Sequence, residues 1–297
     1  MAYTKLAPRH TSGASVEELS PGSAYRLSIP AGSADNYRLA QLDDYAKTSR
    51  SRFPLNARLS LSLNARASNR SIPGTWGFGL WNDPFGLSLG FGGNPFRLPT
   101  LPNAAWFFGA SAESYLSFKD PRVERNEVET KRALPPTSPS QSLNSNDKRA
   151  SSPNGATNAP FSAQRELAAN GFLAQSFCSP KFHPSLILAG LALPFSRKMT
   201  RRLLGRVIHE DGIPLSMDVT QWHRYRLEWR ENRVQFEVDN VQVFESPVSP
   251  NPPLGLVIWI DNQYAAFTPE GKIGFGVVKN PESVWLEIRD LEIDQYI

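Results

Sequence analysis

The residues best suited to chemistry follow an apolar stretch near the C-terminal end of the chain. Residues 254–260 are almost entirely apolar, and after them come four polar or amphipathic residues, Asp261, Asn262, Gln263 and Tyr264. Burial at the end of such a strand raises the pKa of a carboxyl group, which would suit Asp261 to act as a general acid or base, with Tyr264 as its hydrogen-bond donor. The alternative is an aspartate that only bonds the backbone of a strand-end turn.

Glycine and tryptophan share one face of several strands that residue alternation predicts. The predicted strands with glycine opposite their apolar side chains are 75–81, 254–261 and 273–277. Glycine inside a strand costs stability and marks a place where another group comes close to the backbone. We therefore predict a sheet face with a groove over it. The alternative is that the segment 180–206 packs there and fills the space.

A carbohydrate suits such a groove, because a sugar ring offers an apolar face to an indole and hydroxyl groups to polar side chains. The residues predicted to stack on the ligand are Trp81, Trp106 and Trp259. The residues predicted to set its orientation are Asn82, Asp83, Asp261, Asn262 and Tyr264. The sequence thus predicts a protein that binds a carbohydrate or another small molecule.

Other kinds of site have little support in the sequence. A single cysteine, Cys178, excludes an intrachain disulfide and a cysteine-based zinc site, and the four histidines show no metal-ligand spacing. The glycine-rich segment 90–93 lacks the lysine and the serine or threonine of a phosphate-binding loop. We expect no metal and no cofactor.

Alternation also predicts the strands that must position these residues. Leucine and alanine alternate with polar residues over 57–68, and aromatic residues alternate with arginine and glutamate over 222–230. The dipeptide Asp239-Asn240 tolerates positive φ and predicts a tight hairpin turn. With 297 residues and 40% hydrophobic content, the chain can bury a large core. Many short strands separated by turn signals predict an all-β domain of two packed sheets.

Two segments extend this prediction to a family. The sequence PGTWGFGLW at 73–81 is followed downstream by WHRYRLEWRENRVQFEVDNVQVF at 222–244. Together they resemble the family-sixteen glycoside hydrolases (laminarinase-like enzymes) of the concanavalin A-like superfamily, over roughly Tyr37 to Phe244. The resemblance implies a concanavalin A-like jelly-roll β-sandwich of two antiparallel sheets, whose concave face carries a sugar cleft.

The sequence departs from the family at its catalytic strand. The family carries E-x-D-x-x-E just after the first motif, because retaining hydrolysis needs two carboxyl groups about 5 Å apart. The equivalent strand here, 104–111, reads AAWFFGAS and holds no carboxylate. Retaining hydrolysis of the family type is therefore not expected, and the leading hypothesis is a ligand-binding protein. The alternative is an enzyme with different chemistry in the same cleft, using Asp261 and Tyr264.

Composition predicts how the chain is divided. Residues 1–20 are polar and are expected to be disordered, and residues 21–297 are expected to form one jelly-roll domain. A Ser-, Pro- and Asn-rich stretch at about 120–163 has almost no apolar residues and is predicted to be a disordered insertion, since it cannot bury enough surface to order itself.

Charge suggests one further kind of partner. The net charge of +4 does not demand a nucleic acid. A short basic helix is predicted at 196–206, after an apolar run, and its cationic residues are Arg197, Lys198, Arg201, Arg202 and Arg206. A third hypothesis is thus a module that binds a membrane surface or an acidic partner through 185–206. The N-terminus shows no apolar signal segment, so a cytoplasmic location is expected.

Overall fold

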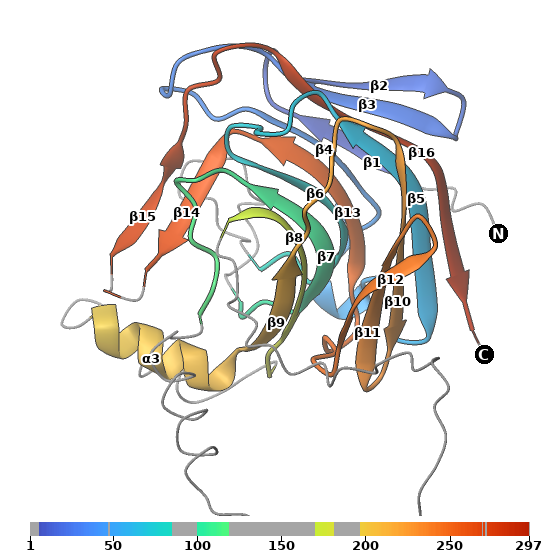
Figure 1. Cartoon of the computed structure of the whole chain (residues 1–297), viewed down its shortest axis with the longest axis vertical. Coiled ribbons are helices and arrows are strands. Elements are labelled where there is room, and N and C mark those ends of the chain that lie inside the picture. The colour runs from blue at the N-terminus through green and yellow to red at the C-terminus, as the bar shows by residue number, and fades with distance from the viewer. Residues whose placement is uncertain are drawn as a thin grey trace, which may run out of the picture. The chain divides into compact units, whose positions relative to one another are not determined.

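The structure is a computed structural model that describes residues 6–46, 48–84, 100–118, 170–180, 197–268, 270 and 272–296. Most of the described chain lies in two seven-stranded sheets, here called sheet A and sheet B, whose neighbouring strands are all antiparallel. Figure 1 shows the two sheets as adjoining layers. The insertion predicted at about 120–163 lies outside the described residues.

Sheet A carries the tryptophans singled out above. Its strands in spatial order are β1 (Ala7–His10), β4 (Leu39–Asp43), β13 (Gly255–Asp261), β6 (Thr75–Trp81), β7 (Ala104–Ala110), β8 (Gly171–Cys178) and β9 (His209–Pro214). The strands β7 and β8 flank the insertion and pair directly, with Ala104 opposite Phe177. The two sides of the insertion are therefore joined within one sheet.

Sheet B contains the alternating segments at 57–68 and 222–246. Its strands in spatial order are β12 (Val241–Ser246), β11 (Arg233–Val238), β10 (His223–Arg230), β5 (Leu59–Ala67), β16 (Val284–Gln295), β3 (Ala24–Ile29) and β2 (Ser15–Ser20). A separate two-stranded sheet pairs β14 (Gln263–Phe267) with β15 (Ile273–Val277). The helices in the described residues are η1 (Arg50–Arg52) and α3 (Arg197–Val207), and α3 confirms the predicted basic helix.

The main core lies between the two sheets. Alternate side chains of facing strands meet there, as the period of two requires. The ring centroid of Phe78 lies 4.9 Å from that of Tyr225, and Phe107 lies 5.3 Å from Phe236. Burying a side chain of this size stabilises the fold by roughly 1.5–3 kcal/mol. The two seven-stranded antiparallel sheets confirm the predicted fold class, a jelly-roll β-sandwich.

The prediction that residues 1–20 are disordered is wrong in its greater part. The strands β1 and β2 lie within this stretch and pair with β4 and β3 at one edge of each sheet. An edge strand is paired on one side only and keeps much of its surface in water, so it accepts polar residues. All six residues of β2 are half-buried or exposed, which explains why its sequence shows no core pattern.

The hairpin between β11 and β12 turns where the sequence predicted. Asp239 and Asn240 have φ of 51° and 64°, the left-handed values of a type I′ turn. Asp239 also accepts hydrogen bonds from the backbone N–H of Arg224 and pairs with His223, whereas Asn240 is an exposed turn residue. The left-handed backbone conformation at position 240 is therefore the main constraint on which residue fits there.

This turn gives a direct test of the fold. Asn240→Gly should preserve the free energy of unfolding, because glycine adopts left-handed φ freely. Asn240→Val should lower it by about 1–2 kcal/mol, since a branched side chain is disfavoured there. Urea denaturation of both variants measures the difference, and equal stabilities would contradict the assigned turn.

Candidate functional site

The face of sheet A that points away from sheet B, here called the distal face, gathers the three predicted tryptophans. Register places Trp259 opposite Gly77 and Trp106 opposite Gly79, so indoles from β13 and β7 extend on the same side as Trp81 of β6. The Trp81 and Trp259 rings are nearly parallel, at 5° with centroids 6.0 Å apart. The Trp106 ring lies 5.7 Å from Trp259 and 6.1 Å from Trp81.

The glycines of the distal face make room for aromatic side chains of neighbouring strands. A methyl group added at Gly77 would lie 3.1 Å from Cη2 of Trp259, and one added at Gly255 would overlap the Tyr45 ring. The glycines predicted at 273–277 lie instead in the two-stranded sheet. There a methyl group at Gly276 would lie 2.8 Å from the Tyr264 ring. These positions are thus occupied by the protein's own rings.

Each indole of the distal face donates its N–H to a polar side chain, either on another strand of sheet A or in the loop after β4. Trp81 Nε1 donates to the Tyr45 hydroxyl at 2.6 Å, and Trp259 Nε1 donates to Thr75 Oγ1 at 3.0 Å. Trp106 Nε1 donates to Gln175 Oε1 at 3.4 Å. The edges of the indoles are therefore anchored, and their orientation is fixed by bonds as well as by packing.

Gln175 leaves one group of this network without a partner. Its side chain is buried on β8, and its Nε2 makes no hydrogen bond to any described residue. A buried amide N–H costs free energy unless it finds an acceptor. Gln175 is therefore the clearest place on the distal face where a ligand oxygen would complete a hydrogen bond.

Asp261 lies at the end of β13 with only 5% of its surface exposed. Oδ1 accepts hydrogen bonds from Thr75 Oγ1 (2.8 Å), Thr75 N (3.2 Å) and Gln263 N (3.1 Å). Oδ2 accepts one, from the Tyr37 hydroxyl at 3.2 Å. Burial raises the pKa of Asp261 to about 6, although the bonds from Thr75, Gln263 and Tyr37 act in the opposite direction. Asp261 can therefore exchange a proton near neutral pH.

The phenol beside Asp261 is that of Tyr37, and the predicted pairing with Tyr264 is corrected. Alternation ends at Asn262, where the chain leaves sheet A and enters β14. Tyr264 consequently lies over the glycines of β15 rather than beside the carboxylate. Burial, and next the charge of Asp261, raise the pKa of Tyr37 well above its ordinary value, so Tyr37 is a hydrogen-bond donor at neutral pH.

Asn262 is a structural link rather than a group that points at a ligand. It is fully buried, and its Oδ1 accepts a hydrogen bond from Arg38 N at 2.8 Å. Its Nδ2 donates to the carbonyls of Asn36 at 3.0 Å and Val278 at 3.1 Å. Both donors and the acceptor are thus bonded to backbone, and they tie three chain segments together.

Asn82 and Asp83 also serve the chain around them. Asn82 Nδ2 donates to the Leu101 carbonyl at 2.9 Å, and its Oδ1 accepts from Asn103 N at 3.0 Å. Asp83 has φ of 48°, and its carbonyl accepts a hydrogen bond from Arg50 Nε at 3.1 Å. The bonds of Asn82 hold residues 100–103 against the end of β6.

Sequence reasoning missed a second buried carboxylate on the distal face, Asp43 of β4. It is fully buried, and it accepts hydrogen bonds from Gln41 Nε2 (2.8 Å) and Tyr45 N (3.2 Å). Burial raises the pKa of Asp43, and the bonds from Gln41 and Tyr45 partly offset this. The available signal was Gln41 and Asp43 two residues apart in the apolar stretch 39–43.

Part of the segment suspected of filling the groove does lie on the distal face. Leu204 of the segment 180–206 packs against the cluster that contains the indoles, and Val207 and Ile208, which follow the segment, are buried in that cluster. Trp106 and Trp259 are each 6% exposed, whereas Trp81 is half-buried. Residues 181–196 lie outside the described part of the chain. Trp81 is therefore the indole that a ligand reaches first.

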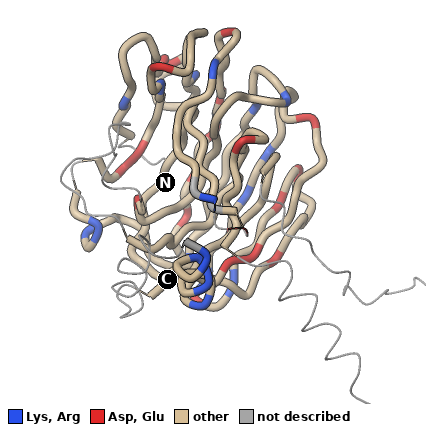
Figure 2. Tube along the Cα trace, turned by 90° about the vertical axis from the view of Figure 1, so that its left-hand side faces the viewer, with Lys and Arg blue, Asp and Glu red and all other residues tan. Residues whose placement is uncertain are grey.

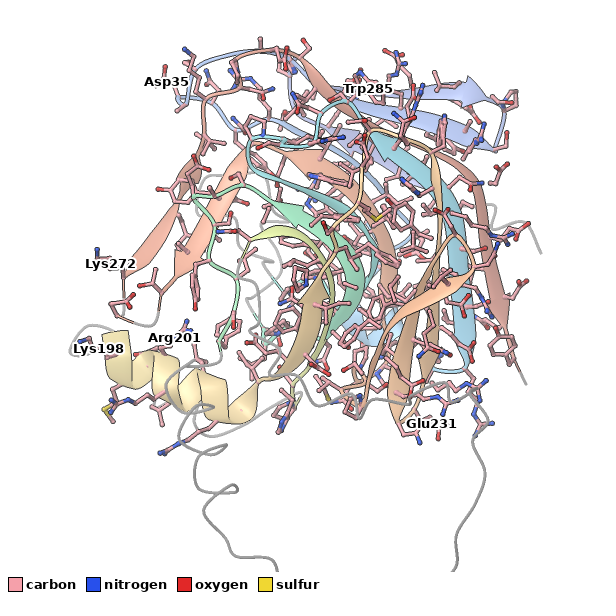
Figure 3. The ribbon with its side chains drawn as sticks, viewed as in Figure 1. Asp35, Lys198, Arg201, Glu231, Lys272 and Trp285 are labelled. Carbon is pink, nitrogen blue, oxygen red and sulfur yellow. The ribbon has the colours of Figure 1, made fainter. Side chains whose placement is uncertain are left out.

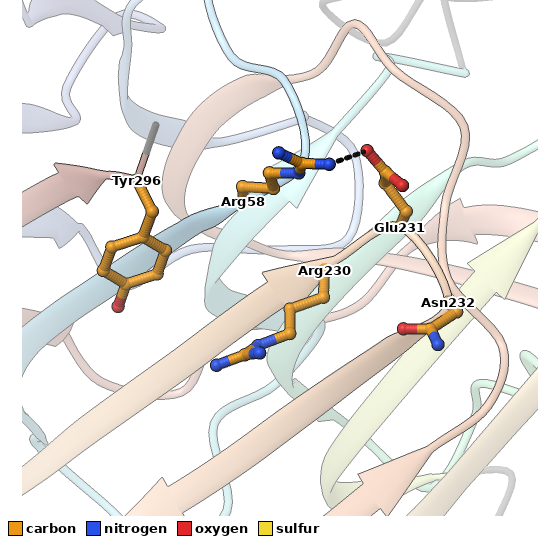
Figure 4. Close-up of a pocket in the computed structure, with 5 residues that line it drawn as sticks. All are labelled: Arg58, Arg230, Glu231, Asn232 and Tyr296. Atoms are coloured by element: carbon orange, nitrogen blue, oxygen red, sulfur yellow. Dashed lines mark ion pairs between the residues drawn. The ribbon is translucent and has the colours of Figure 1, made fainter.

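A cavity of about 410 Å³ lies elsewhere, at the end of sheet B. Figure 4 shows the residues that line it, Arg58, Arg230, Glu231, Asn232 and Tyr296. Arg58 forms a 3.2 Å ion pair with Glu231 in which both side chains are largely exposed. Arg230 pairs with Glu228 at 2.5 Å. This polar hollow has no indole platform.

Among the described residues, no group of three His, Cys, Asp or Glu side chains could hold a metal ion.

No protein-family model and no curated protein sequence matches the chain. Among solved structures it is similar to LamAcat from Zobellia galactanivorans, with 12% identity over 93% of this chain and 78% of that one and a TM-score of 0.42. A GH16 protein of a Bacteroides ovatus mixed-linkage glucan locus, in complex with G4G4G3G product, gives 9% identity, coverages of 98% and 95%, and a TM-score of 0.42. A sialidase gives 7% identity, coverages of 98% and 17%, and a TM-score of 0.40. At these identities and TM-scores the similarities carry no conclusion about what this chain does.

Proposed function

We propose that the distal face of sheet A binds a carbohydrate or a related small molecule. The observation that carries the proposal is the indole platform of Trp81, Trp106 and Trp259, set among the buried polar groups of Asp261 and Gln175. Aromatic faces beside a few fixed polar groups are typical of a small-molecule site. A sugar matches this composition with its apolar ring faces and its hydroxyl groups.

The face of sheet B that points away from sheet A, here called its solvent face, has a different composition from the distal face of sheet A. On β5 that face carries Ser60, Ser62, Asn64 and Arg66 in alternation. Its tryptophans are covered by cations, since the Arg66 guanidinium lies 4.9 Å from the Trp222 ring and 5.3 Å from the Trp285 ring. An exposed sheet face here is therefore polar and ionic, unlike the distal face of sheet A.

The free hydrogen-bonding capacity of the distal face suits hydroxyl groups. Asp261 Oδ2 accepts one hydrogen bond whereas Oδ1 accepts three, so Oδ2 keeps room for a ligand donor. Gln175 Nε2 offers a donor without a partner in the described chain. In this proposal the ligand is an oligosaccharide that stacks on Trp81 at the half-buried end of the platform. Register places Asp261 opposite Thr75, six residues or about 20 Å along the sheet from Trp81, so only an extended ligand reaches it.

A second candidate is acid–base chemistry at Asp261, which its pKa of about 6 favours. Glycoside hydrolysis by Asp261 together with Asp43 is not expected. Register places Asp43 opposite Val257 and Asp261 opposite Leu39, so the two lie four residues apart along neighbouring strands, about 13 Å. Hydrolysis needs carboxyl groups roughly 5 to 9.5 Å apart.

Ligand binding is tested by thermal stability against a panel of β-glucan oligosaccharides and apolar metabolites. A binder gains about 2.7 kcal/mol of stability at a hundredfold excess over its dissociation constant, a visible rise in Tm. Trp81→Ala should remove the rise, because the first stacking surface is lost. Trp222→Ala, an indole on the solvent face of sheet B, is the matched control and should keep it. Loss in both variants, or in neither, would contradict the assigned platform.

The burial of Asp261 is tested by the pH dependence of unfolding. Its pKa in the folded chain is about 6. Because this exceeds the unfolded value of about 3.9, the folded state binds the proton more tightly and stability falls as pH rises from about 4 to 6. The fall due to Asp261 is about 3 kcal/mol, and Asp261→Asn should abolish it. An Asp261→Asn variant with the same pH dependence as the parent would refute the shift.

The same variant separates the two candidate functions. If the site only binds, Asp261→Asn should weaken affinity for an identified ligand by about tenfold, the loss of one charge-assisted hydrogen bond. If Asp261 is an acid or base, turnover of that ligand should disappear while affinity falls no further. Calorimetry and product analysis on the same samples distinguish these outcomes.

A further inference from the structure

The helix α3 presents a line of cations on the side turned away from the protein. Lys198, Arg202 and Arg206 are exposed and are spaced four residues apart, so they lie on one stripe with successive charges about 6 Å apart along the axis. Figure 2 shows Lys and Arg gathered along this helix. The helix contains no Asp or Glu.

These cations are not explained by bonds within the protein. Lys198, Arg202 and Arg206 form no ion pair with any described residue, whereas Arg26 and Arg66 share Glu287 and Arg230 pairs with Glu228. Lys198 also lies in the first turn, where the helix dipole disfavours a positive charge and no acidic residue compensates. The helix dipole therefore does not explain Lys198, and the stripe leaves its charge available to a partner.

The opposite side of α3 is already in use. Thr200 and Val207 are buried, and Leu204 packs against the cluster under the indoles. A helix that lies on a bilayer must bury its apolar side in the lipid, and that side is unavailable here. No described helix is long and apolar enough to cross a membrane. The arrangement thus favours a partner met in water through charge.

One exposed apolar side chain accompanies the stripe. Met199 is 54% exposed beside Lys198. The β14–β15 hairpin adjoins α3, since Arg201 of α3 contacts the Tyr115 ring and Tyr115 forms a β-bridge with Ala266 of β14. The turn of this hairpin carries the exposed residues Lys272 and Glu270. Figure 3 labels Lys198 and Lys272 at the neighbouring ends of these elements. Methionine and arginine together are enriched at protein interfaces, and a polysaccharide would have no apolar side chain to offer Met199.

We propose that the exposed stripe of α3, formed by Lys198, Met199, Arg202 and Arg206, docks an acidic segment of a partner protein. The segment would carry carboxylates at intervals near 6 Å and an apolar side chain against Met199. This surface is independent of the ligand site, because its side chains point away from the distal face of sheet A.

The test measures fluorescence anisotropy of a labelled peptide of alternating glutamate and leucine with the full chain at low salt. Lys198→Glu, Arg202→Glu and Arg206→Glu in one variant should weaken binding by about 100-fold. A matched variant with Arg52→Glu, Arg224→Glu and Lys279→Glu carries the same change in net charge at exposed positions elsewhere, and its affinity should fall less than threefold. Circular dichroism and Tm verify that both variants fold.

Three results would overturn the proposal. The first is equal weakening in the two triple variants, which would reduce the effect to net charge. The second is a glutamine–leucine peptide that binds as well as the acidic one. The third is binding to vesicles of anionic phospholipid without binding to the peptide, which would assign the stripe to a membrane surface. Met199→Ser should weaken binding of the glutamate–leucine peptide severalfold and leave binding of a glutamate–serine peptide unchanged. Equal effects on the two affinities would contradict the proposed apolar contact with Met199.

Discussion

Burial of sheet A on both faces is the constraint on which the rest of the structure depends. All seven residues of β13 are buried, with Leu256 and Ile258 in the core between the sheets and Val257, Trp259 and Asp261 on the distal face. On β13 the core face carries only aliphatic side chains. The distal face also takes polar groups out of water, and each of them needs a partner inside the protein.

Hydrogen bonds within the distal face satisfy most of these buried polar groups. Thr75 links two of its members, since it accepts the indole N–H of Trp259 and donates to Asp261. Tyr45 receives the N–H of Trp81 in the same way. Where the network is incomplete, at Gln175 Nε2 and at Asp261 Oδ2, it leaves capacity that a hydroxylated ligand can use. The proposed site is therefore the part of this buried surface whose bonding is unfinished.

Alternation predicted most of the strands and the side of sheet A on which Trp81, Trp106 and Trp259 gather, because the period of two fixes which residues share a face. The dipeptide Asp239-Asn240 predicted the hairpin turn. Alternation failed to identify the hydrogen-bond partners of Asp261, which lie far along the chain. Tyr37 lies 224 residues from Asp261 and Thr75 lies 186, and no local pattern joins them. The glycines predicted an open groove above the sheet. The strand register shows that aromatic rings of neighbouring strands occupy the space above these glycines. The edge strands β1 and β2 escaped prediction since neither buries a continuous face.

The central claim is that a ligand binds to the indoles of the distal face. The most direct test follows the seven indole N–H signals of the chain by ¹⁵N–¹H NMR during titration with a β-glucan oligosaccharide. The account predicts that the signals of Trp81, Trp106 and Trp259 move together and saturate with one dissociation constant, while those of Trp222 and Trp285 stay in place. Movement confined to Trp222 and Trp285 would contradict it, as would three distal signals that stay unmoved by every compound that stabilises the protein.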